Sequence, residues 1–140
     1  MKAQIIVNAA LKFFPIVLFF TSGFSHIISD EISVLIFSQL GVEPWGRFLI
    51  GALEIATGFL MILPGRSLEA GILGAVLALG MVVLHLAILG TELNGDNGYR
   101  FSLALILLTA CLGLIIVHRS ELKGLPRKLS ALSWKNIKMP

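Results

Sequence analysis

The sequence has 140 residues, of which 56% are hydrophobic and 14% are charged, whereas an ordinary soluble domain has about 25% charged residues. Its apolar residues form long runs, which leave room for four membrane-spanning helices and no separate soluble domain. The net charge of +3, without a nucleic-acid-binding motif, excludes nucleic acid as the expected partner. The single cysteine, Cys111, excludes an intrachain disulfide and a multi-cysteine metal or redox motif, and we expect it to pack inside the bundle.

The first predicted span covers residues 11–28, with Lys12 near one end and His26 near the other. Pro15 then falls in the first turn, where its missing N–H group costs least. An apolar N-terminal run that follows a lysine and precedes small residues is also the pattern of a cleaved signal peptide. Because Lys12 interrupts this run, we expect the segment to be retained.

Residues 29–44 predict a short helix between the first two spans, because two acidic residues precede an apolar stretch that is too short to cross a bilayer. We expect it to be interfacial or re-entrant, N-capped by Ser29 or Asp30 and ending near Gly41. Two interpretations stay open: a lid over the mouth of the bundle, or a helix that rests on the lipid headgroups.

The second predicted span, residues 45–63, contains one carboxylate near its middle, Glu54. An acidic side chain at the centre of a membrane helix costs roughly 2.5–3.5 kcal/mol on insertion scales, so it usually has a functional or interhelical role. Helical spacing places Arg47, Gly51 and Gly58 on the same face as Glu54.

The third predicted span covers residues 68–89 and follows a tight Pro-Gly turn. Ala70, Gly74 and Ala78 recur at intervals of four, which predicts a face of small residues that another helix can approach closely. The same face leads to His85, about one turn before the end of the span.

Residues 90–99 predict a turn-rich loop, and the fourth predicted span covers residues 100–117. The loop contains Asp, Asn and Gly residues, as calcium-binding loops do, but it lacks the twelve-residue ligand pattern of such loops. We therefore expect no calcium site there. Residues 118–140 form a basic tail expected to contact anionic lipid headgroups. Its apolar residues predict a short interfacial helix from Pro126, with Leu129 and Trp134 on the lipid side.

Basic residues predict the orientation of the four spans. The side that holds both termini carries nine lysines and arginines, and the opposite side carries only Arg47 and Arg100. The positive-inside rule then places both termini in the cytoplasm, which makes this a multi-pass protein of the cytoplasmic (inner) membrane.

Each of the four spans places one polar side chain near the outer membrane boundary, and Glu54 lies about 10 Å deeper than Arg47 in the second span. These ligand-pocket candidates are His26, Arg47, His85 and Arg100, together with Glu54. The alternative is that Glu54 is only an interhelical hydrogen-bond partner, that the arginines snorkel and that the histidines are boundary residues. We expect no metal site, because no His-x-x-His or Glu-x-x-His pair is present and Glu54 differs in depth from both histidines.

Two stretches resemble the DoxX-like family of small four-helix membrane proteins: residues 10–26, ending in Thr-Ser-Gly-Phe-Ser-His, and residues 51–60, centred on Glu54. His26 stands where many relatives have lysine. The positive charge that lysine carries permanently at this position would depend on pH in histidine. The resemblance implies a protein of the cytoplasmic membrane. Some relatives are linked to quinone-dependent oxidation of sulfur compounds or to oxidative-stress complexes.

We therefore expect an all-α bundle of four transmembrane helices, acting as an accessory or redox-associated subunit without catalytic residues of its own. Its polar pocket would hold a quinone-like or lipid-like molecule, and its partners would be the bilayer and either a membrane redox protein or further copies of the chain. The alternatives are a small-molecule or proton-coupled transporter that uses Glu54, and a purely structural scaffold. Alternating access is disfavoured because no inverted repeat is evident.

Overall fold

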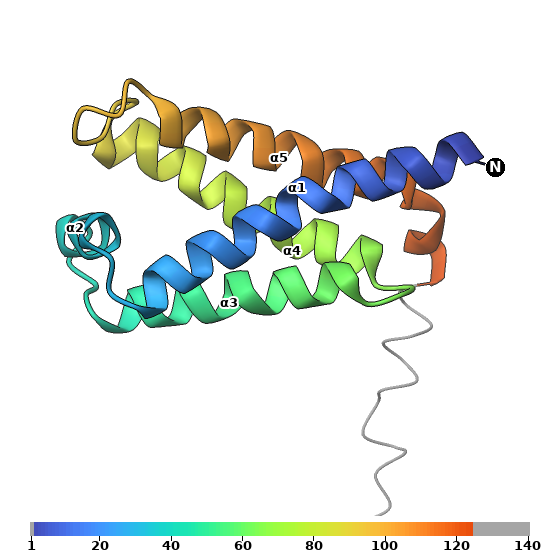
Figure 1. Ribbon diagram of the computed structural model, residues 1–140, viewed down its shortest axis with the longest axis horizontal. Helices are drawn as coiled ribbons and strands as arrows, with labels where there is room; N and C mark the ends of the chain where they lie inside the picture. The colour runs from blue at the N-terminus through green and yellow to red at the C-terminus, as the bar shows by residue number, and fades with distance from the viewer. Residues whose placement is uncertain (1, 125–140) are drawn as a thin grey trace, which may run out of the picture.

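The computed structural model describes residues 2–124, which are helical apart from short connections. Its four long helices are α1 (Lys2–Ile27), α3 (Trp45–Ile62), α4 (Ser67–Leu84) and α5 (Tyr99–Val117). They run alternately up and down, so that residues 2 and 124 lie at the same end of the bundle (Figure 1). Each of the four contains or begins a segment long and apolar enough to cross a membrane. The predicted all-α, four-span architecture is thus confirmed.

The four long helices form a ring in which each contacts two neighbours. Helix α1 packs most extensively on α3, and α4 on α5, while the α1–α5 and α3–α4 contacts close the ring. Many large apolar side chains on the outside of the helices are exposed, among them Phe13, Leu49, Val76 and Ile116. This is the arrangement expected of helices that face lipid.

Helix α1 begins earlier than expected, at Lys2 instead of near residue 11. Pro15 therefore lies in the helix interior and is fully buried, so its placement in the first turn was wrong. A proline at this position cannot donate a hydrogen bond to the carbonyl four residues earlier. In a membrane helix, neighbouring helices make such a break tolerable.

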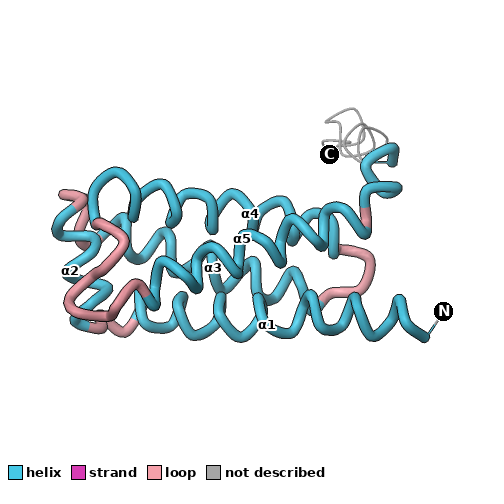
Figure 2. The backbone as a smooth tube through the Cα atoms, turned by 90° about the horizontal axis from the view of Figure 1, so that it is seen from above, coloured by secondary structure: helices cyan, strands magenta, loops and turns pink. Residues whose placement is uncertain are grey.

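A short helix, α2 (Glu31–Gln39), lies across the end of the bundle where α1 ends and α3 begins (Figures 1 and 2). Its Ile36 and Phe37 are buried against Leu89 and Leu93, which follow α4. The helix thus covers this end of the bundle, and it packs on protein through one face. The tail helix predicted from Pro126 lies outside the described residues.

The central core contains Phe19, Met61, Ala70, Cys111 and Leu114. The predicted small face of α4 is confirmed, because Ala70, Gly74 and Ala78 are all buried. A Cβ atom built on Gly74 would lie only 2.8 Å from the sulfur of Cys111. Cys111 is therefore a packing residue, as expected.

Helices α1 and α3 approach each other through a pair of glycines. A Cβ built on Gly23 would lie 2.9 Å from the carbonyl oxygen of Gly51, and one on Gly51 would lie 3.0 Å from the carbonyl oxygen of Gly23. Neither position has room for a side chain. This contact sets the register between the two helices and brings His26 beside Glu54.

Candidate ligand-binding site

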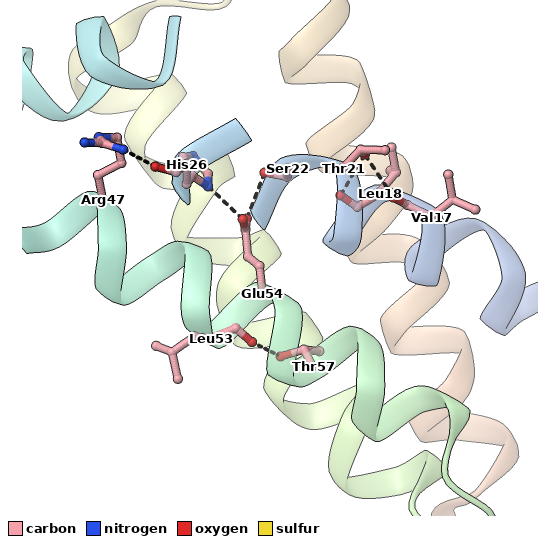
Figure 3. A network of polar contacts seen from close by, with 9 residues as sticks. All are labelled: Val17, Leu18, Thr21, Ser22, His26, Arg47, Leu53, Glu54 and Thr57. Carbon is pink, nitrogen blue, oxygen red and sulfur yellow. Dashed lines mark hydrogen bonds and ion pairs between the residues drawn. The ribbon is translucent and has the colours of Figure 1, made fainter. Parts of the chain in front are cut away.

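Glu54 joins α3 to α1 through both of its carboxylate oxygens (Figure 3). Its Oε2 lies 2.8 Å from Nδ1 of His26, and its Oε1 accepts a 3.1 Å hydrogen bond from the hydroxyl of Ser22. Glu54 and His26 are 6% and 3% exposed. The carboxylate is therefore an interhelical partner within the membrane-spanning region. Its burial on one face with Arg47, Gly51 and Gly58 agrees with the helical spacing.

Arg47 is buried but belongs to a different set of contacts. Its Nε donates to both carboxylate oxygens of Glu43, at 2.9 and 3.0 Å. Its Nη1 donates to the backbone carbonyl of His26 (Figure 3). The side chain does not snorkel to the surface, and its hydrogen bonds go to Glu43 and His26. Arg47 instead secures the C-terminal end of α1 to the first turn of α3.

His85 begins a π-helical segment, η1 (His85–Leu89), that continues α4. Its Nδ1 lies 2.8 Å from the carbonyl oxygen of Gly90, and its ring packs edge-on against Phe101 of α5. π-Helical turns are uncommon and often occur at functional sites. Here the turn ends at Gly90, whose φ of 82° favours glycine.

Arg100 lies in the first turn of α5, and its Nε is 3.8 Å from a carboxylate oxygen of Asp96. Asp96 also accepts hydrogen bonds from the backbone N–H groups of Leu93, Gly98 and Arg100. The donation from Leu93 is the leading cause that lowers the pKa of Asp96 below its ordinary value of 3.8. This carboxylate organises the loop before α5.

A cavity of about 310 Å³ lies beside Glu54, at the end of the bundle covered by α2. Four of the five predicted pocket residues line it, namely Glu54, His26, His85 and Arg100, and Arg47 does not. Most of the wall is apolar, with Phe19, Leu77 and Leu107 among its residues. The cavity thus combines an apolar wall with a few convergent polar groups, the usual character of a small-molecule site.

Several polar lining residues were not among those predicted from the sequence. Ser22, Ser25, Ser33 and Tyr99 also line the cavity. Ser22 lies four residues before His26, so a search for polar residues on one face of the first span would have found it. Ser33 had no such signal, because its position depends on how α2 lies over the bundle.

Comparisons of the chain with protein-family models, with curated proteins and with solved structures gave no match. Within residues 2–124, no group of three or more His, Cys, Asp or Glu side chains is arranged to hold a metal ion.

Proposed function

We propose that this integral membrane protein is DoxX-like and binds a quinone-like or lipid-like small molecule in the cavity between its helices. The observation that carries this proposal is the cavity of about 310 Å³ in which Glu54, His26 and His85 meet a mostly apolar wall. Ligand pockets commonly measure about 300–1,000 Å³. This cavity is at the lower end of that range, which suits a single ring or a short headgroup.

The route into the cavity supports a ligand that dissolves in the bilayer. Most lining residues are buried or half-buried, whereas Thr21 of α1 and Tyr99 and Arg100 of α5 are exposed. The rim of the cavity therefore follows the seam between α1 and α5, two helices with lipid-facing surfaces. An apolar tail would extend through this seam while the polar end of the ligand meets the histidines.

An accessory role in redox chemistry follows from the resemblance to the DoxX-like family, some of whose members take part in quinone-dependent oxidation. This chain would contribute binding and orientation of the ligand. The Glu54–His26 pair would also hold one exchangeable proton beside the bound molecule, since Nδ1 and Oε2 are within hydrogen-bond distance.

The binding proposal is tested by mass spectrometry of the full chain purified in mild detergent. We expect a co-purifying hydrophobic molecule and a higher melting temperature after addition of a short-chain quinone. Ala104→Phe places a large ring at a buried position on the cavity wall and should abolish both effects. Ala56→Phe is the control, because Ala56 is exposed on α3 and does not line the cavity. Loss of both effects in the control would contradict the assignment to this cavity.

We also propose that both termini are cytoplasmic and that the membrane is the cytoplasmic one, from the excess of basic residues on the terminal side. Cysteine labelling tests this orientation, because the natural Cys111 is fully buried. Asn94→Cys should react with a membrane-impermeant maleimide added to intact cells. Ser120→Cys should react only after the cells are opened, and the reverse pattern would overturn the orientation.

A further inference from the structure

His85 has one ring nitrogen bonded within the protein and one left over. Its Nδ1 is 2.8 Å from the carbonyl oxygen of Gly90, and a carbonyl oxygen only accepts hydrogen bonds, so Nδ1 carries the proton. In the neutral ring Nε2 is then an acceptor. The side chain is 1% exposed and lines the cavity. Within residues 2–124, its one hydrogen bond is the bond to Gly90. His85 therefore offers an acceptor without a donor partner among the described residues, and it does so at the cavity wall.

The opposite part of the inner wall is also rich in acceptors. Both carboxylate oxygens of Glu54 face α1, where Oε1 already receives the proton of the Ser22 hydroxyl. The charged donor, Arg100, lies at the exposed rim beside Asp96, and Tyr99 lies there too. Ser25 and Ser33 rotate to donate or accept and do not favour either kind of ligand. His85 and Glu54, two fixed groups deep in the cavity, thus call for hydrogen-bond donors on the ligand.

We infer that the cavity selects an apolar molecule that presents a hydroxyl donor to Nε2 of His85, such as a phenol or the reduced quinol form of a quinone. This inference rests on the proposed binding function and specifies its ligand class. The oxygens of an oxidised quinone are acceptors only, and one of them would face the lone pair of His85 and leave that nitrogen unpaired. His85 is accordingly the residue that determines the preference.

Three probes with the same ring test the preference in the full chain, purified in detergent and kept free of oxygen. They are duroquinol, which has two hydroxyl donors, duroquinone, which has two carbonyl acceptors, and the dimethyl ether of duroquinol, which has no donor. We expect calorimetry to give duroquinol a dissociation constant about tenfold lower than that of duroquinone, the size of effect typical of one buried hydrogen bond. The ether should bind as weakly as the quinone.

Two substitutions of His85 separate its Nε2 from its role in the fold. His85→Asn retains an amide N–H for Gly90 but has no acceptor at the position of Nε2, so the preference for duroquinol should disappear. His85→Gln places an amide that donates or accepts near that position, so the quinol and the quinone should bind about equally. His118→Asn is the control, because His118 lies at the far end of the bundle with Asn8 and Glu121, and it should keep the tenfold preference.

The outcomes distinguish this inference from the proposed function. Equal affinity of the wild-type protein for duroquinol and duroquinone would overturn the inference and leave the binding function standing. Failure of all three probes to bind would overturn both this inference and the binding of a quinone-like molecule. If His85→Asn does not fold, the ether probe in the wild-type protein and the Gln variant still decide the question.

Discussion

His26 and Glu54 are 28 positions apart in the sequence, yet Nδ1 of the imidazole and Oε2 of the carboxylate lie 2.8 Å apart between α1 and α3. Their side chains are 4% and 8% exposed, so the contact is made away from solvent. A carboxylate inside a membrane bundle usually pairs with another polar group, because an unpaired one is costly. The contact therefore explains how α3 carries an acidic residue near its middle.

The coupling between His26 and Glu54 is measurable by a double-mutant cycle. We expect Glu54→Gln and His26→Gln each to lower the free energy of unfolding, with a coupling of about 1 kcal/mol, since hydrogen bonds between membrane helices contribute about 0.6–1.7 kcal/mol. Unfolding in mixed micelles provides the measurement. Glu92→Gln in the exposed loop before α5 is the control and should have almost no effect. Additive effects of the two substitutions would contradict a direct contact.

Alanine should have opposite effects at Gly51, which belongs to the close contact with Gly23, and at Gly80, which has open space beside it. Gly51→Ala would place a methyl group 2.9 Å from Cβ of His26 and 3.0 Å from the carbonyl oxygen of Gly23, and such overpacking costs about 1–3 kcal/mol. Gly80→Ala meets no atom within 4 Å and should stabilise α4 by roughly 0.5–1 kcal/mol, because alanine is the better helix former. Melting temperatures in detergent measure both. A stabilising Gly51→Ala would show that α1 and α3 do not approach each other at this point.

Two arginine–glutamate pairs should differ in their contribution to stability. Arg47→Gln leaves the Glu43 carboxylate and the His26 carbonyl without their donor in a buried region, so we expect a loss of about 2–3 kcal/mol. Arg66→Gln removes a 3.6 Å contact with Glu69 from a side chain that is 55% exposed, and it should cost less than about 1 kcal/mol. Chemical unfolding of both variants in the same detergent tests the contrast. Equal losses would argue against a buried role for Arg47.

The loop before α5 should lose stability in acid. Backbone N–H donation from Leu93, and then from other amides and the Arg100 guanidinium, lowers the pKa of Asp96 below 3.8 in the folded protein. The unfolded chain therefore binds the proton first, so the stabilisation is present above about pH 4 and is lost as the pH falls through the lower folded pKa. Asp96→Asn should be less stable at neutral pH and should lose less stability on acidification.

The control for this pH effect is Asp30→Asn. Asp30 precedes α2 but makes no capping hydrogen bond with its side chain, so this variant should keep the acid sensitivity of the wild-type protein. Melting temperatures measured from neutral pH to about pH 3 compare the three proteins. Parallel curves for the wild type and Asp96→Asn would contradict the role assigned to the carboxylate.

The helices follow from apolar runs in the sequence, and the buried face of α3 follows from its spacing of Arg47, Gly51 and Glu54. The partner of Glu54 does not follow from the sequence, because it depends on how closely α1 approaches α3. The Gly23–Gly51 contact determines that distance. Arg47 and Glu43 have the i,i+4 spacing of a helical ion pair, but Glu43 precedes the helix and lies in the predicted connection, so the spacing alone does not predict their contact. The π-turn at His85 has no sequence signature, because it depends on the packing of neighbouring helices.

The cavity lies between the two most extensive helix contacts of the bundle, α1 with α3 and α4 with α5. His26 and Glu54 belong to the first pair of helices, whereas η1 and α5 supply His85 and Arg100 to the same wall. A molecule that contacts both sides would link the α1–α3 hairpin to the α4–α5 hairpin, and the two hairpins could not separate without releasing it. At a hundred times its dissociation constant such a ligand would add about 2.7 kcal/mol to the unfolding free energy. If the proposed ligand binds here, the stability of the contact between the two hairpins would depend on how much of this molecule the membrane contains.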